Sequence, residues 1–246
     1  MERHGQIRVG RRKYTRNGYT DPSFAGFKPI ICLTKSTAYG SLGPYVIKDG
    51  KGRIVENIWQ FAKVYTDIPK STQRYSRYDP RVIWDHPAEL HVREDGTLTE
   101  DYWTWRKKGM RCKDAVRYPV GFNHRHKCLY ALSEEDLEER LDYIQSRKKI
   151  YLPLYTSCVQ GLPQFIKLKS LIEQGENLLI IEVDGPHEES LSYYKENYGV
   201  EDEFILKDTV LVTPEYMKLL LNDSKHPFGH GYCLGMALLD MDLTGF

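Results

Sequence analysis

Residues 45–65 read YVIKDGKGRIVENIWQFAKVY and contain the two signals from which we predict the fold. Asp-Gly-Lys-Gly at 49–52 follows an apolar stretch and precedes another, which predicts a β-hairpin turn. Residues 55–65 then space their apolar side chains as a helix does, and the pattern ends before Pro69. A hairpin followed by an amphipathic helix indicates a chain that mixes α and β structure.

One face of the predicted helix collects a carboxylate, an amide and an amine, from Glu56, Gln60 and Lys63. At about 100° per residue, these three fall within about 60° of one another around the axis, opposite Ile58 and Phe61. In a cleft, this face would offer an acid or base, a hydrogen-bonding clamp and an amine nucleophile. Facing water, it would be the polar side of an ordinary amphipathic helix.

The rest of the chain fits one α+β domain. The prolines and polar turns of residues 66–127 indicate a long irregular insert, a kind of segment that often carries function. We expect a basic arm over residues 1–26 and a single domain over residues 27–246. The other predicted elements are strands at 28–34, 178–186 and 208–213, and helices at 133–148, 161–177 (closed by Gly175) and 214–223.

Composition indicates a folded soluble protein. The chain has 246 residues, of which 41% are apolar and 28% charged. No stretch approaches the roughly 18 uncharged apolar residues of a membrane helix, and the basic N-terminus lacks the apolar core of a secretory signal. Five widely spaced cysteines without a CxxC pair predict reduced thiols and a cytoplasmic location. No P-loop, HExxH, GxSxG or GxGxxG motif is present, which argues against the enzyme classes that use them.

Positive charge is concentrated early in the chain, although the 35 basic and 34 acidic residues nearly balance overall. Basic residues dominate 3–16 and 103–127, and several stand beside aromatic residues. Such a surface can hold phosphates and stack on bases, or it can be a core edge covered by arginine stems. The candidates for nucleic-acid binding are Arg74, Arg77, Trp103, Trp105, Arg106, Lys107, Lys108 and Arg111.

Three short motifs each allow two interpretations. HRHKC at 124–128 could bind zinc or be basic surface, and because no fourth ligand is obvious we predict no metal site. WDHPAELH at 84–91 could pair His86 with Glu89 as acid and base, or be a polar loop. HPFGHGYCLG at 226–235 could bring backbone N–H groups close to an anion such as a pyrophosphate at Gly229 and Gly231, or be a tight turn.

Two segments together resemble the NADAR superfamily. Its helix pattern, close to S-E-H-Y-F-Q-A-x-K, has its Glu, Gln and Lys at Glu56, Gln60 and Lys63, and Trp59 replaces its aromatic residue. Its C-terminal motif, near G-x-N-R-L-G-x-x-L-M, is similar to GHGYCLGMALLDMD, with Leu234 and Gly235 matching but Tyr-Cys in place of Asn-Arg. YGSLGPY, ending at Tyr45, loosely resembles the ligand-contacting segment that precedes the hairpin. The resemblance covers about 45 residues, and the chain resembles a distant or viral-type member.

The resemblance implies an N-glycosidase. Members remove ADP-ribose from guanine in DNA or nucleotides, or cleave ribosylated pyrimidine intermediates, and the proposed mechanism forms a lysine Schiff base with the opened ribose. Carried over, Lys63 would be the nucleophile, Glu56 the acid or base and Gln60 a contact to a ribose hydroxyl, with Lys48 as a rival lysine. This chemistry requires no cofactor.

Alternative functions remain open at this stage. The chain could hydrolyse a small ribosylated metabolite, bind nucleic acid without catalysis through residues 3–16 and 103–127, or act as a scaffold. The expected partner is ADP-ribosylated guanine, in DNA or as a nucleotide, and no membrane.

Overall fold

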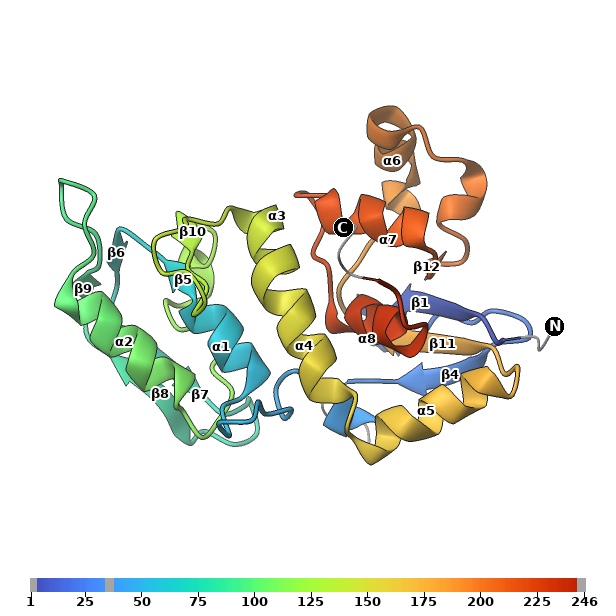
Figure 1. The fold of residues 1–246 in the computed structure, drawn as a ribbon, viewed down its shortest axis with the longest axis horizontal. Coiled ribbons are helices and arrows are strands. Elements are labelled where there is room, and N and C mark those ends of the chain that lie inside the picture. Colours follow the sequence, from blue (N-terminus) through green and yellow to red (C-terminus); the bar gives the residue numbers. More distant parts are fainter. Residues whose placement is uncertain (1–3, 34–37, 243–246) are drawn as a thin grey trace. The chain divides into compact units, whose positions relative to one another are not determined.

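The computed structural model describes residues 4–33 and 38–242 of the chain (Figure 1). Helices and strands are mixed along it, which confirms the expected α+β composition. The chain forms two compact units: unit 1 comprises Met1–Gly43 and Tyr155–Phe246, and unit 2 comprises Pro44–Leu154. In sequence, unit 2 is an insertion into unit 1 that is longer than the expected insert at 66–127. No helix of the described residues is long and apolar enough to cross a membrane.

A four-stranded sheet forms the centre of unit 1. Its strand order is β12 (Thr209–Leu211), β1 (Ile7–Arg11), β11 (Leu178–Glu182) and β4 (Lys28–Ile31). β1, β11 and β4 run parallel, and β12 is antiparallel to β1. All five residues of β11 are buried, as is typical of a central strand covered on both faces. The three strands predicted in this part of the chain are present but shorter, and the predicted end at residue 34 lies outside the described residues.

The N-terminal segment differs from the expected basic arm over residues 1–26. Its β1 lies inside the sheet, where Ile7 and Val9 are fully buried. Two of its arginines bind groups of the same unit. Arg8 Nε donates to Thr209 Oγ1 at 2.7 Å, and Arg12 forms a bidentate pair with Asp21 at 2.5 and 2.7 Å. These two side chains therefore stabilise the fold.

The helices of unit 1 largely follow the predicted boundaries. α5 (Pro163–Glu173) ends just before Gly175, whose φ of +86° suits glycine, and α7 (Pro214–Asn222) begins with a proline after the Thr213 cap. All nine residues of α8 (His230–Leu238) are buried, and it lies against β1 and β11 (Figure 1). Unit 1 also contains α6 (Leu191–Tyr198) and the hairpin of β2 (Lys13–Thr15) and β3 (Gly18–Thr20).

Unit 2 combines several helices with three small antiparallel strand pairs. The predicted DGKG hairpin is present as a tight turn with a bridge between Lys48 and Ile54. The pairs are β5 (Lys63–Val64) with β10 (Tyr130–Ala131), β6 (Asp67–Ile68) with β9 (Glu89–Leu90), and β7 (Ser71–Arg74) with β8 (Val82–His86). The helices are α1 (Val55–Phe61), α2 (Glu100–Met110) and α3 (Tyr143–Ser146), followed by a π-helical turn (Arg147–Tyr151) and α4 (Leu152–Val159), within which unit 2 ends.

The predicted helix at 133–148 starts later than expected. Its N-terminus is at Asp142, whose side chain accepts from the Gln145 N–H while Gln145 caps the Asp142 N–H in return. This reciprocal cap is a capping box, and it marks a helix start later in the chain than the predicted start at residue 133. Residues 133–140 instead form turns in which Asp136 accepts from the Glu138 and Glu139 N–H groups.

Aromatic side chains fix α1 against α2. The Phe61 ring lies 4.6 Å from the ring of Trp105 and 4.9 Å from that of Trp84, and all three rings are buried. Gly109 of α2 faces the same ring, and a Cβ at this position would lie only 2.0 Å from Phe61 carbons. A glycine is therefore required where the two helices approach most closely.

We predict that Gly109→Ala destabilises the protein. Alanine favours a helix over glycine by about 1 kcal/mol, but overpacking a filled core costs about 1–3 kcal/mol. The steric cost should prevail because the Phe61 ring is held between two tryptophans. Urea unfolding should show a loss of about 1–2 kcal/mol, whereas Gly50→Ala, where a Cβ meets nothing within 4 Å, should not. Equal stability of the two variants would contradict this packing.

Candidate functional site

The predicted polar face of α1 forms a continuous chain of hydrogen bonds in unit 2. Lys63 Nζ donates to Gln60 Oε1 at 2.9 Å, and Gln60 Nε2 donates to Glu56 Oε1 at 2.8 Å. The structure thus brings together the amine, amide and carboxylate that the sequence places on one face. We call these three residues the polar relay.

Lys63 reaches the relay from a strand and not from the predicted helix over 55–65. α1 ends at Phe61, and Lys63 is the first residue of β5, where it pairs with Ala131 of β10. Pairing with β10 requires an extended backbone, so the helix ends two residues before the lysine. The side chain nevertheless extends back to Gln60, so that the predicted contact forms with a different backbone geometry.

The relay lies largely out of water. Glu56 is only 5% exposed, and Gln60 and Lys63 are half-buried. Burial lowers the pKa of Lys63, an effect that nearby Cys128 and Glu56 partly oppose. The Trp59 ring centroid lies 4.8 Å from Lys63 Nζ and adds a cation–π contact. A half-buried lysine with a lowered pKa is closer to the neutral, nucleophilic form than an exposed one.

Cys128 is a neighbour of the relay that the sequence did not suggest as part of it. Its thiol lies 3.3 Å from the Tyr130 carbonyl oxygen in the segment that leads into β10. Burial raises the pKa of Cys128, and the charge of Lys63 lowers it in part. The pairing of β5 with β10 brings Lys63 and Cys128 close together. These residues are 65 positions apart in the sequence, so no local pattern indicates their contact.

The other residues suggested by the resemblance occupy different settings. Lys48 is exposed in the turn before α1, and Tyr45 is half-buried with the Arg117 guanidinium 5.9 Å from its ring centroid. Trp59 is buried against Tyr151 at 5.2 Å. Of the two candidate lysines, only Lys63 is part of the relay.

The C-terminal glycines surround an anion that belongs to the protein itself. In unit 1, the Gly231 N–H donates to Glu182 Oε1 at 3.2 Å, and a Cβ on Gly229 would lie 2.3 Å from the same oxygen. Gly229 and Gly231 therefore allow the start of α8 to approach the fully buried Glu182 carboxylate at the end of β11. The expected role of these glycines, binding a pyrophosphate, is not what this arrangement shows.

Leu234 and Gly235 also pack inside unit 1. Both are buried in α8, and a Cβ on Gly235 would lie 3.0 Å from Val212 and 3.5 Å from Ile7. These two residues hold the helix close to the sheet.

His230 and Glu182 form a buried pair that holds a proton. His230 Nδ1 lies 3.1 Å from Glu182 Oε2, and His230 Nε2 lies 3.1 Å from the Cys32 carbonyl oxygen. A carbonyl only accepts, so Nε2 carries a hydrogen, and a further proton is shared between Nδ1 and the carboxylate. Burial alone lowers the pKa of His230, but Glu182 and the Cys32 carbonyl together outweigh it and raise the pKa. The lone acid that ends the apolar run LLIIE was the sequence signal for this pair.

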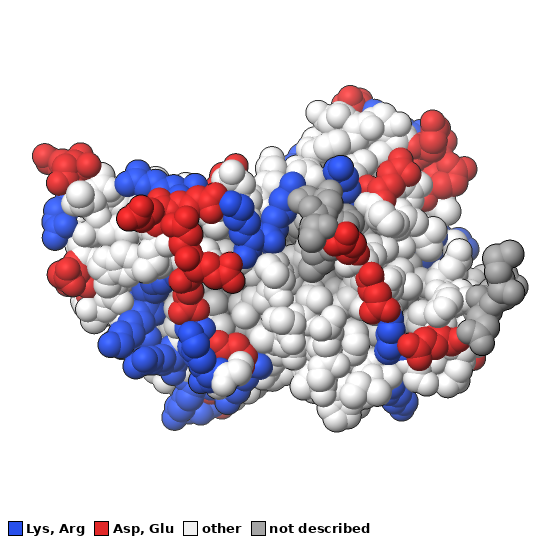
Figure 2. Space-filling model, in the orientation of Figure 1, with Lys and Arg blue, Asp and Glu red and all other residues white. Residues whose placement is uncertain are grey.

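The predicted basic and aromatic residues divide into structural and surface groups. Trp105 is fully buried in the core, and Arg106 donates to the Ala62 and Leu132 carbonyl oxygens at 3.3 and 2.9 Å. Lys108 Nζ lies 5.1 Å from the Trp84 ring centroid. Arg74 and Arg77 are exposed at the β7–β8 hairpin. Figure 2 shows basic and acidic side chains side by side on the drawn face of unit 2.

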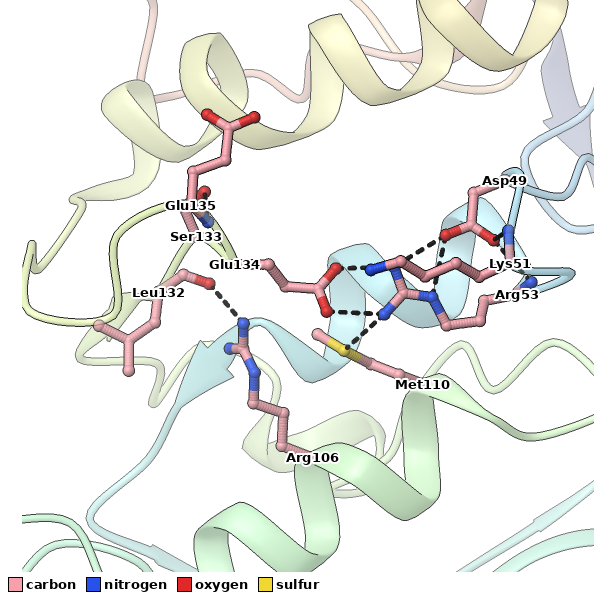
Figure 3. Close-up of polar contacts among 9 residues, drawn as sticks. All are labelled: Asp49, Lys51, Arg53, Arg106, Met110, Leu132, Ser133, Glu134 and Glu135. Atoms are coloured by element: carbon pink, nitrogen blue, oxygen red, sulfur yellow. Dashed lines mark hydrogen bonds and ion pairs between the residues drawn. The ribbon is translucent and has the colours of Figure 1, made fainter.

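Four of these residues line one groove of about 390 Å³ in unit 2. One wall comes from α2, and the other comes from the turn at residues 134–137. Arg53, which the sequence analysis had not suggested, binds Glu134 through two contacts of 2.7 Å and Asp49 through contacts of 2.8 and 2.9 Å (Figure 3). We call this the α2 groove; its lining residues are Arg53, Trp103, Arg106, Lys107, Met110, Arg111, Glu134 and Leu137.

A group of potential metal ligands lies outside the HRHKC motif, for which we predicted no metal site. Among the described residues, His187, Glu189 and Asp208 of unit 1 have ligand atoms within 4.8 Å of one another. Lys13 Nζ already lies 2.9 Å from Glu189 and 3.3 Å from Asp208. The lysine thus supplies the positive charge that these acids need.

In the second motif, WDHPAELH, the buried His86 and His91 meet the half-buried Glu89. His86 Nε2 and His91 Nε2 lie 3.7 and 3.5 Å from different oxygens of Glu89. Burial lowers the pKa of His91 to about 4, so this imidazole is neutral at pH 7. Its ring also contacts Trp105 at a centroid distance of 5.0 Å, which makes the cluster part of the aromatic core.

Comparison of the chain with family models, curated proteins and solved structures found no match.

We predict that the Glu182–His230 pair makes stability fall as the pH rises above about 6.5. The folded pair keeps a proton that the unfolded histidine has lost, and a group with a raised folded pKa stabilises until the pH passes that pKa. The slope can reach about 1.4 kcal/mol per pH unit. Urea unfolding of Glu182→Gln should show a flat or reversed slope, because burial without the carboxylate favours neutral His230.

The control for this measurement is Glu176→Gln, which changes an exposed acid of the same unit. It should retain the slope of the unaltered protein. If Glu182→Gln retained that slope as well, His230 would not hold the additional proton.

Proposed function

We propose that this protein is an N-glycosidase that removes ADP-ribose from guanine, in DNA or in a nucleotide, within a NADAR-like fold. The observation that carries the proposal is the polar relay. A half-buried lysine of lowered pKa is linked through Gln60 to a buried carboxylate. The same three residues match the Glu, Gln and Lys of the NADAR helix pattern.

The relay can supply each group that the reaction needs. The neutral amine of Lys63 attacks C1 of the ribose while the bond to guanine breaks, and the Glu56 carboxyl group protonates the leaving base. The carboxylate then takes the proton that the new amine bond releases. Opening of the ribose gives a Schiff base, and water hydrolyses it to ADP-ribose and the free lysine. The net reaction consumes one water and regenerates both side chains.

Gln60 is suited to the position between the two ionisable groups. Its amide oxygen accepts from the lysine while its amide nitrogen donates to the carboxylate, so that both are oriented by one planar group. A direct ion pair would stabilise the charged lysine and raise its pKa. The Gln60 amide separates the Glu56 carboxylate from the Lys63 amine. The carboxylate therefore opposes the lowering of the Lys63 pKa by burial less than it would in a direct ion pair.

The buried Glu182–His230 pair does not favour a second activity in the same way. Its atoms are enclosed by α8 and the sheet, where the Gly229 and Gly231 backbone contacts the carboxylate.

A ribosylated metabolite would use the same relay as ADP-ribosylated guanine. The comparison of nucleotide and DNA substrates therefore distinguishes these two versions of the proposal.

We predict that Lys63→Met abolishes release of ADP-ribose from ADP-ribosylated DNA or nucleotide. Loss of a covalent nucleophile should lower kcat at least about a thousandfold. Glu56→Gln, which can still accept from Gln60, should lower it about a hundredfold or more through loss of proton transfer. Lys70→Met removes an exposed lysine of unit 2 and serves as the control. Chromatography of released ADP-ribose measures all of these rates.

Full activity of Lys63→Met would exclude the proposed nucleophile. The pH dependence gives an independent criterion, since only the neutral amine attacks. The step also needs a protonated Glu56, so the rate should follow a bell-shaped pH profile, and the limb set by Lys63 should lie below the ordinary pKa of lysine because burial lowers the pKa of Lys63.

A further inference from the structure

The α2 groove has a regular wall of one aromatic and two basic side chains. Trp103, Lys107 and Arg111 follow one another at intervals of four residues along α2 and its C-terminal cap. Side chains at this spacing lie on one side of a helix, about one turn apart. The three therefore form a row along the groove, with Trp103 at one end and Arg111 at the other.

The acidic side chain that lines the groove is already paired. Glu134 is bound by the Arg53 guanidinium, which lowers the pKa of this carboxyl group and keeps it ionised (Figure 3). Arg53 is in turn also bound by Asp49. Within the described parts of the chain, Lys107 and Arg111 have no carboxylate within ion-pair distance, and both are exposed.

The floor of the groove adds a fixed positive charge. Arg106 is 5% exposed, and its guanidinium is bound by the Tyr102 hydroxyl and two backbone carbonyl oxygens, which are uncharged. Its charge adds to that of Lys107, and the lining carries four basic side chains against one carboxylate, Glu134, which interacts with both Arg53 and Arg106. The groove thus presents a net positive potential, which selects anionic ligands.

Trp103 gives the groove an aromatic end. Its ring is half-buried and lies edge-on to Tyr102 at a centroid distance of 5.0 Å and an angle of 67°. Contact with Tyr102 restricts the indole, and a restricted indole is a suitable surface for a flat heterocycle. The volume of about 390 Å³ falls in the range of about 300–1,000 Å³ that is typical of small-ligand sites.

We propose that the α2 groove binds a nucleotide, with its phosphate held by Lys107 and Arg111 and its base stacked on Trp103. The site is distinct from the polar relay. Phe61 packs on α2, and Glu56 and Gln60 each lie about 100° away from their α2-facing neighbours Asn57 and Phe61 around α1. The choice of guanine as the base rests on the proposed function, whereas the phosphate and stacking contacts do not.

Calorimetric titration with guanosine monophosphate tests the site, with inorganic phosphate and guanosine as partial ligands. The whole nucleotide should bind about tenfold more tightly than either part, because stacking and charge contribute together. Lys107→Glu/Arg111→Glu should weaken nucleotide binding at least about tenfold. Trp103→Ala should also weaken it, and Trp103→Phe should largely restore it.

The matched control is Lys113→Glu/Lys127→Glu, which makes the same change in net charge at two exposed lysines of unit 2 outside the groove. It should leave nucleotide binding within about twofold, and circular dichroism should show that both double variants are folded. Equal losses in the two double variants would overturn the site in favour of a general charge effect. So would equal affinity for nucleotide and inorganic phosphate.

A single-stranded DNA of about ten nucleotides distinguishes the source of the nucleotide. If the ligand is part of a strand, the DNA should bind more tightly than the mononucleotide, and Lys107→Glu/Arg111→Glu should reduce its salt slope by about 1.4. Tighter binding of the mononucleotide would identify a free nucleotide.

The groove and the hydrolase can fail separately. Lys63→Met should still bind nucleotide while it releases no ADP-ribose. If the unaltered protein bound nucleotide but hydrolysed nothing, the nucleotide site would stand and the proposed N-glycosidase activity would be excluded. If it released ADP-ribose but bound no nucleotide at Lys107 and Arg111, the activity would stand and the nucleotide site would be excluded.

Discussion

The position of α1 against α2 is the constraint on which the arrangement of unit 2 depends. Phe61 enters a space that only Gly109 leaves open, between two buried tryptophans. This contact fixes the rotation of a helix only seven residues long. With its apolar face held, the helix turns Glu56 and Gln60 toward Lys63 on β5. A packing contact between two apolar groups thereby orients the polar groups that we propose for catalysis.

The periodicity of the sequence predicted the relay but not the backbone that builds it. Glu56 and Gln60 lie four residues apart on α1, which helical spacing alone could establish. Lys63 was expected on the same helix and lies on a strand instead. The helix ends early because β10 offers backbone hydrogen bonds from more than 60 residues further along the chain. The periodicity of a short stretch of sequence contains no information about a strand that pairs with it from far along the chain.

Other features of both units depend on contacts between distant residues and were therefore not predictable. The glycines at the start of α8 signalled a close approach to an anion, yet the anion is Glu182, nearly 50 residues earlier. Likewise, the basic residues were visible in the sequence, but their roles were not. Arg8 and Arg12 stabilise unit 1, whereas Lys107 and Arg111 remain at the surface of unit 2. Burial and pairing decide which charges remain available, and only the folded structure shows both.

Reductive trapping of the reaction intermediate tests the central claim most directly. Borohydride added during turnover of ADP-ribosylated guanine should reduce the Schiff base to a stable secondary amine. Peptide mass spectrometry should then find the sugar attached at Lys63, and none in Lys63→Met. Turnover without a trapped adduct, or an adduct on another lysine such as Lys48, would contradict the account.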